Sequence, residues 1–188
     1  MTQNVVFLIT LLACLVFHVF SVRAEKPLSD QDATLYYRDC IDDPSNAALD
    51  KDVRDSLCSC AASRYIQEMS MEDILVINAN RPEATQARHK LLLEVLTPCL
   101  EIPVSDILEK ECLTSSAFNV MPKEKKLDIC LCSSYAISEE MSSVGKEFLR
   151  QKLKNEPDFK NPLLSFVNSP VFEQISRQVI RDCVEDYN

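Results

Sequence analysis

The chain of 188 residues contains one glycine, no tryptophan and two histidines. A single glycine excludes glycine-rich phosphate-binding loops and the glycine-dependent turns of short β-hairpins. So few histidines leave almost no basis for nucleophilic or metal chemistry that depends on imidazole. Scarce glycine, few β-branched runs and several helix-capping motifs together predict an all-α fold.

Recognisable catalytic motifs are also lacking. His89 is the only histidine after residue 24, and its basic neighbours Arg88 and Lys90 are typical of a solvated helix face. The sequence has no H-E-x-x-H motif, P-loop or EF-hand loop, and no carboxylate pair is singled out by its spacing. We therefore predict a protein without enzymatic activity, catalytic residues, metal or cofactor. The net charge of −9 further disfavours nucleic acid as a partner.

The first two dozen residues resemble an export signal. Residues 5–20 are apolar except for Thr10 and His18, and Val22 and Ala24 place small side chains at the −3 and −1 positions of a cleavage site. This pattern predicts a signal peptide over residues 1–24, cleaved after Ala24. The mature chain would then be secreted or periplasmic and would not be an integral membrane protein.

Two alternatives to cleavage after Ala24 remain open. Counted to Val22, the apolar segment is 18 residues long, which is near the lower limit for an uncleaved membrane anchor. Leu11-Leu12-Ala13-Cys14 also resembles a bacterial lipobox, although cleavage there would leave an apolar stub. In each case the same eight cysteines follow in the folded part. They are Cys40, Cys58, Cys60, Cys99, Cys112, Cys130, Cys132 and Cys183.

The cysteine spacing indicates an internal duplication. A C-x17-C-x-C pattern begins at Cys40 and again at Cys112, at an offset of 72 residues. A fourth cysteine follows in each copy, and Cys99 and Cys183 are offset by 84 residues. The second copy therefore carries about 12 extra residues, which we place near 154–164.

The duplication predicts a disulfide-stapled helical bundle built from two tandem related four-cysteine units. The first unit covers residues 25–101 and the second covers 102–188, and we expect the two to pack as one body. The helices are expected at about 29–41, 47–69, from 70, 82–96, 105–112, 122–141, 143–155 and from 169. Pro98 is expected to end the 82–96 helix. Leu127, Leu131, Tyr135, Ile137 and Val171 are among the positions expected to face the core.

Helix geometry restricts how the cysteines can pair. Two residues separated by one position point about 200° apart on a helix, so the C-x-C cysteines should not bond each other. Each should instead reach one outer cysteine, which is Cys40 or Cys99 in the first unit and Cys112 or Cys183 in the second. Two pairings per unit remain open. An even cysteine count in an exported chain favours such disulfides over a zinc site.

The function predicted from the sequence is that of an exported, non-enzymatic binding protein that presents a rigid helical surface. The candidate contact surface combines Lys146, Arg150 and Lys154, which are four residues apart on one helix face, with Phe159 and Phe166 of the insertion. The alternative for the two phenylalanines, and the default for buried aromatic side chains, is that they cap the core. The partner would be another protein or an anionic lipid surface. One alternative is a binder of lipid or small apolar ligands, and a second is a thiol-disulfide redox protein that uses the C-x-C pairs. The oligomeric state is left open.

Overall fold

The computed structural model describes residues 26–79, 83–157 and 162–187, and the predicted leader over residues 1–24 lies outside these ranges. Within them the chain is helical, with one isolated antiparallel bridge between Pro27 and Ser70. The predicted all-α fold is therefore confirmed for the described residues. The α-helices are α2 (Asp30–Asp42), α3 (Lys51–Glu68), α4 (Met71–Asn78), α5 (Ala84–Lys90), α6 (Glu101–Thr114), α7 (Lys123–Glu140), α8 (Lys146–Asn155), α9 (Pro162–Val167) and α10 (Pro170–Asp186).

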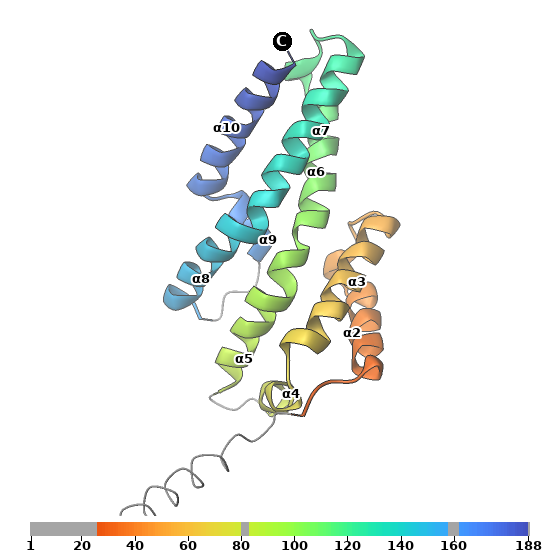
Figure 1. The fold of residues 1–188 in the computed structure, drawn as a ribbon, viewed down its shortest axis with the longest axis vertical. Coiled ribbons are helices and arrows are strands. Elements are labelled where there is room, and N and C mark those ends of the chain that lie inside the picture. The colour runs from red at the N-terminus through yellow and green to blue at the C-terminus, as the bar shows by residue number, and fades with distance from the viewer. Residues whose placement is uncertain (1–25, 80–82, 158–161, 188) are drawn as a thin grey trace, which may run out of the picture.

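Two long helical rods run through the middle of the molecule (Figure 1). In the central rod, residues 84–114, α5 continues through a π-helix (Leu91–Leu96) and a 3-10 turn (Thr97–Cys99) into α6. In the second rod, residues 123–155, α7 continues through a π-helix (Met141–Gly145) into α8. The chain reverses between the rods, so that α6 and α7 pack antiparallel.

The central rod corrects the prediction that Pro98 ends a helix. Proline lacks an N–H and normally interrupts the hydrogen-bond ladder. Here the preceding turns widen to a π-helix, and the Leu92 carbonyl accepts hydrogen bonds from the N–H of Thr97 and from its Oγ1, the latter at 2.7 Å. The Leu100 N–H then donates to the Thr97 carbonyl at 3.1 Å. The carbonyls near the proline therefore accept hydrogen bonds from other donors, and the rod continues into α6. The predicted boundary between the two units, at residues 101 and 102, lies within the first turn of α6.

The second rod also joins two helices that were predicted to be separate. We expected a new helix at Ser143, but the backbone is right-handed helical at Met141 and remains so at Gly145 and Lys146. Gly145 has a packing role, because a Cβ there would lie 2.9 Å from Sδ of the fully buried Met141. The only glycine of the chain therefore makes room for a core side chain and does not form a turn.

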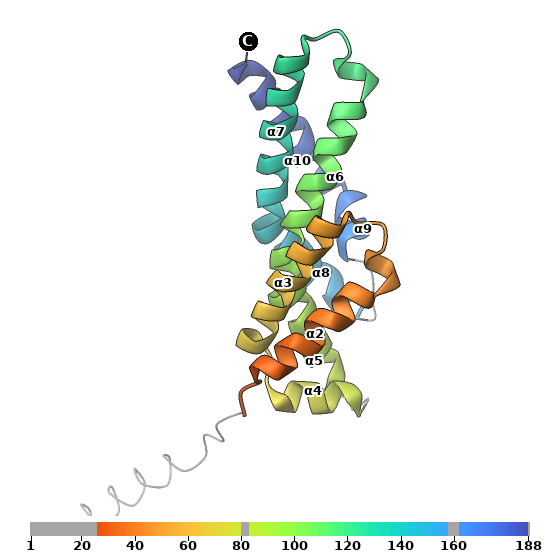
Figure 2. The same ribbon diagram turned by 90° about the vertical axis from the view of Figure 1, so that its right-hand side faces the viewer.

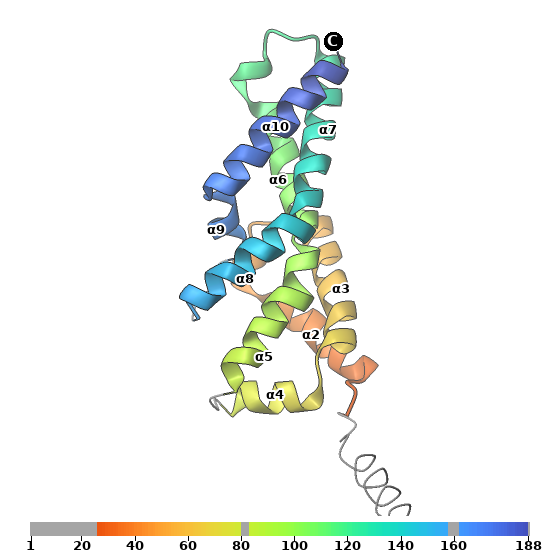
Figure 3. The ribbon, with the colours of Figure 1, turned by 60° about the vertical axis from the view of Figure 1, so that its left-hand side comes forward.

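The other helices pack around these rods (Figures 2 and 3). α2 and α3 form a hairpin, in which the rings of Tyr36 and Tyr65 stack with centroids 4.2 Å apart, and α3 also contacts the central rod. α10 lies along α7 and contacts α9. One buried cluster contains Leu28, Leu57, Ala61, Met69, Val95 and Cys99, and the other contains Leu100, Val104, Ile137, Met141, Leu149, Phe166 and Phe172. Cys99 of the central rod belongs to the first cluster, and the next residue, Leu100, belongs to the second. The two clusters are therefore joined by one continuous helical rod.

Four disulfides link neighbouring helices. Cys40–Cys58 joins α2 to α3, Cys60–Cys99 joins α3 to the central rod, Cys112–Cys130 joins α6 to α7, and Cys132–Cys183 joins α7 to α10. The prediction that each C-x-C cysteine bonds a different outer cysteine is confirmed. In both halves the first C-x-C cysteine takes the preceding outer cysteine, and the second takes the following one.

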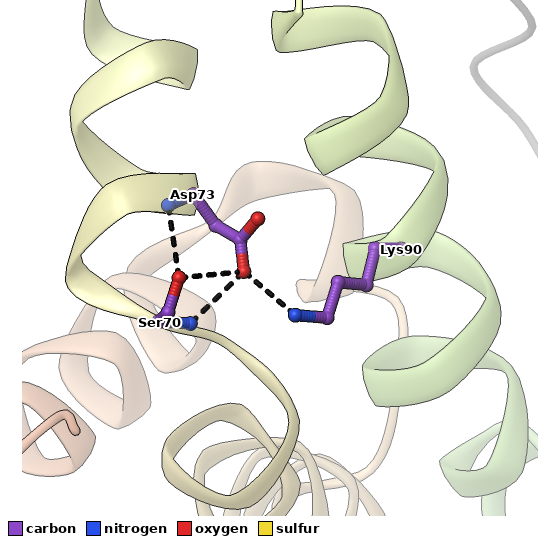
Figure 4. A network of polar contacts seen from close by, with 3 residues as sticks. All are labelled: Ser70, Asp73 and Lys90. Atoms are coloured by element: carbon purple, nitrogen blue, oxygen red, sulfur yellow. Dashed lines mark hydrogen bonds and ion pairs between the residues drawn. The ribbon is translucent and has the colours of Figure 1, made fainter. Parts of the chain in front are cut away.

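A polar network fixes the start of α4 (Figure 4). Ser70, where a helix start was expected, forms a capping box with Asp73, in which the Ser70 N–H donates to Asp73 Oδ2 at 3.0 Å and the Asp73 N–H donates to Ser70 Oγ at 3.2 Å. Lys90 Nζ of α5 also reaches Asp73 Oδ2, at 2.7 Å. Burial acts to raise the pKa of Asp73, but the hydrogen bonds from Lys90 and Ser70 outweigh burial, so the pKa lies below its usual value.

Asp73→Asn should lower the free energy of unfolding by about 1 kcal/mol at neutral pH, because it weakens a helix cap and removes the ion pair with Lys90. A carboxyl with a lowered folded-state pKa stabilises the fold above its unfolded-state pKa, and this contribution is lost as the pH falls through the folded-state pKa. Urea unfolding of both proteins should therefore show a difference that shrinks below about pH 4. Glu72→Gln, at an exposed neighbour, is the control. An equal effect of the two substitutions would contradict the assigned role of Asp73.

Candidate functional site

The outward face of α7 carries three apolar side chains. Leu127, Leu131 and Tyr135 are 42%, 44% and 68% exposed, so the prediction that they face the core is wrong. Val171, on α10, is also exposed, whereas Ile137 faces the core as predicted. Leu127, Leu131 and Tyr135 are four residues apart and therefore follow one ridge of the helix. We call these three residues the α7 row.

Three serines share the buried face of α7 with Ile129, Cys130 and Ile137. Ser133, Ser134 and Ser138 are each at most 5% exposed. Ser134 Oγ donates to the Leu131 carbonyl at 3.2 Å, and Ser138 Oγ donates to the Tyr135 carbonyl at 2.8 Å. These two hydroxyls are therefore satisfied within the helix and can be buried at little cost. The small side chains suit a helix that packs against both α6 and α10.

α3 provides an internal comparison for the α7 row. Both helices have 18 residues, and both carry a C-x-C pair that begins at the eighth residue. Counted from these cysteines, the residues of α3 that correspond to the α7 row are Asp55, Ser59 and Ser63, which are all exposed and polar. The corresponding ridge of α3 thus carries no apolar side chain, although α3 matches α7 in length and in the place of its C-x-C pair. The α7 row is therefore the candidate contact surface, and aligning the two C-x-C helices is the sequence signal that would have identified it.

The three predicted contact cations lie on α8, and two of them are paired with carboxylates. Lys146 Nζ contacts Glu94 of the central rod, and both side chains are partly buried. Arg150 contacts Glu147 one turn earlier on the same helix, and Lys154 is exposed. Because neighbouring carboxylates offset much of the positive charge, the attraction of this helix face for anionic lipid is reduced.

The two phenylalanines predicted for the same surface are placed differently. Phe166, on α9, is 0% exposed, and its ring centroid lies 5.7 Å from that of Phe148 and 5.5 Å from that of Phe172. The prediction that Phe166 belongs to a contact surface is wrong, because α9 turns this ring into the core between α8 and α10. Phe159 lies outside the described residues.

The histidine has a structural contact. His89 Nε2 lies 3.0 Å from the carbonyl oxygen of Pro157, which links α5 to the end of α8. This hydrogen bond is to a backbone group and not to a nucleophile or a carboxylate. Across the described ranges, no group of three or more His, Cys, Asp or Glu side chains is arranged to hold a metal ion.

A surface depression of about 410 Å³ runs along α10. All six lining residues belong to that one helix, and they are Pro170, Glu173, Gln174, Arg177, Gln178 and Arg181. A binder of apolar ligands is expected to have an enclosed pocket lined by aliphatic and aromatic side chains. This polar and open depression does not have those properties.

Comparison with protein-family models, curated proteins and solved structures found no match for this chain. Among the helices of the described residues, none combines the length and the apolarity that crossing a bilayer requires. The four disulfides are consistent with an extracellular or otherwise oxidising compartment.

Proposed function

We propose that this chain is an exported, non-enzymatic binding protein that presents a rigid helical surface, with the α7 row as its point of contact. The observation that carries the proposal is the exposure of three apolar side chains on one ridge of α7. The equivalent ridge of α3 is polar. Contiguous exposed apolar side chains are typical of interaction sites.

The disulfides support the rigidity that this function needs. Cys130 and Cys132 tie α7 to α6 and to α10, so the helix that carries the α7 row is held covalently from two sides. A surface held in its binding conformation loses little conformational entropy when a partner docks. The same bonds would preserve the surface outside the cell, where the predicted leader over residues 1–24 would direct the chain.

We also propose that residues 25–101 and 102–188 are tandem related units. The matching spacing of the first three cysteines, the equal lengths of α3 and α7 and the same order of disulfide partners in each half support this proposal. The additional residues of the second unit would lie near 154–164. On this basis the polar ridge of α3 and the apolar ridge of α7 have diverged from one ancestral surface.

The two alternative functions have less support. A thiol-disulfide redox protein that uses the C-x-C pairs would be expected to form a bond within each pair, whereas all four cysteines of the two pairs bond outer cysteines. An anionic lipid surface would need free cations, whereas Lys146 and Arg150 are paired with carboxylates.

Photo-crosslinking tests the proposed function. A photo-reactive amino acid in place of Leu131 should give a discrete crosslinked species when the protein is irradiated in the compartment that it enters. The same amino acid in place of Ser59, the equivalent exposed position of α3, should give none or far less. Mass spectrometry would identify the captured partner. Equal labelling from the two positions, or none from Leu131, would contradict the α7 row as the contact surface.

A further inference from the structure

The α7 row is flanked by opposite charges on the same ridge of the helix. Four residues before Leu127 is Lys123, and four residues after Tyr135 is Glu139. Both charged residues are exposed, and neither has an ion-pair partner in the part of the chain that the structure describes. The ridge therefore reads Lys-Leu-Leu-Tyr-Glu in steps of four residues, with a cation at one end and an anion at the other.

This order is complementary to itself when reversed. We propose that two copies of this chain pair through their α7 rows in an antiparallel arrangement, with a two-fold axis at Leu131. The proposal rests on the proposed function and names the partner of the same surface. Each surface of a two-fold interface meets its own copy, so Leu131 contacts the other Leu131, and Leu127 faces Tyr135. Lys123 of each copy then faces Glu139 of the other, which forms two ion pairs.

Helix packing geometry is compatible with this pairing. Ridges formed by residues four apart interdigitate when two helices cross at about −50°, which is the commonest packing class. The two ridges then run along each other at Leu131 although the helix axes cross. Each step of four residues also turns about 40° around the helix, so Lys123 and Glu139 lie roughly 80° to either side of Leu131 and their long side chains have to reach across to the partner. A parallel arrangement would instead place the two lysines together and the two glutamates together. The charges therefore favour the antiparallel arrangement.

The size of the surface predicts a weak dimer. Each copy contributes three apolar side chains and two charges, compared with about 20–30 residues a side in a standard stable interface. We therefore expect a dissociation constant in the high micromolar range. The disulfides that hold α7 keep the entropic cost of docking low, which favours even this small interface. We assign the partner as a second copy of the chain because the positive and negative ends of the ridge complement each other. A binding site for an unrelated protein would not need this self-complementarity.

Sedimentation equilibrium of the oxidised protein, from micromolar to millimolar concentration, tests the pairing. The native chain should show a monomer–dimer equilibrium, and Leu131→Ser should raise the dissociation constant by at least about tenfold, because the residue lies on the axis and is lost from both copies. Leu35→Ser is the matched control, since Leu35 of α2 is 47% exposed against 44% for Leu131. Circular dichroism and free-thiol titration would establish that both variants are folded. A monomer at every concentration, or equal weakening by the two substitutions, would overturn the proposal.

Charge exchange tests the antiparallel arrangement. Lys123→Glu and Glu139→Lys should each weaken dimerisation by several-fold, because each places like charges together twice. The double variant should return to the native dissociation constant, and an equimolar mixture of the two single variants should form a mixed dimer. A double variant as weak as the single ones would overturn the arrangement. A chain that stays monomeric but is crosslinked through position 131 to another protein would overturn self-pairing and leave the proposed binding function intact.

Discussion

Phe166→Ala is expected to lower the free energy of unfolding by about 3–5 kcal/mol, the largest effect of any single substitution proposed for this chain. The side chain is fully buried, and its ring contacts Phe148 of α8 and Phe172 of α10 edge-on. Truncation removes these contacts and leaves a cavity between α8, α9 and α10. All three helices would have to move to fill it. Equilibrium unfolding in urea, with the disulfides intact, measures the change.

Leu164→Ala is the matched control for this prediction. Leu164 lies on the same short helix, two residues before Phe166, but is 56% exposed. Its truncation should change the free energy of unfolding by less than about 1 kcal/mol. Similar losses for the two substitutions would mean that α9 does not bury one side against the core.

Removal of the Cys132–Cys183 disulfide should destabilise the protein by about 4 kcal/mol, and removal of Cys112–Cys130 by about 3 kcal/mol. The first bond closes a separation of 51 residues and the second a separation of 18, so the first restricts the unfolded chain more. The bonds are otherwise well matched, because each joins one buried and one partly buried cysteine. Their loops do not overlap along the chain, so each pair of substitutions opens only one of the two loops.

Paired alanine substitutions, with peptide mapping to establish that the other bonds are retained, would measure the two losses by guanidinium unfolding. The order of the losses is the critical result. A larger loss from Cys112–Cys130 would show that packing between α6 and α7, and not restriction of the unfolded chain, controls what these bonds contribute.

The C-x-C motif illustrates how far the sequence alone can determine a bonding pattern. The turn of a helix prevents Cys58 and Cys60 from bonding each other, and order along the chain supplied Cys40 and Cys99 as the outer partners. The final choice between two pairings depended on which helix lies on which side of α3. Contacts between segments that are distant in sequence determine that choice, and local helix geometry does not predict such contacts.

The start of a helix could be predicted from the sequence more reliably than the face that the helix buries. Ser29 and Ser70 were expected to start helices, and both form capping boxes, because the required partner lies only three residues away. The apolar pattern predicted the buried side of α7 only in part: Ile137 faces the core as expected, but Leu131 is exposed and Ser134 is buried. A helix that packs against two neighbours selects side chains by size as well as by hydropathy.

The sequence by itself therefore determined the all-α class, the capped helix starts and the set of cysteines available to each C-x-C pair, since these follow from interactions within a few residues or from order along the chain. Tertiary structure alone decided that the helices join into two rods through Pro98 and Ser143, that Phe166 is buried and that Leu131 is exposed. These outcomes depend on how closely distant segments approach each other, and packing of the whole chain sets that distance.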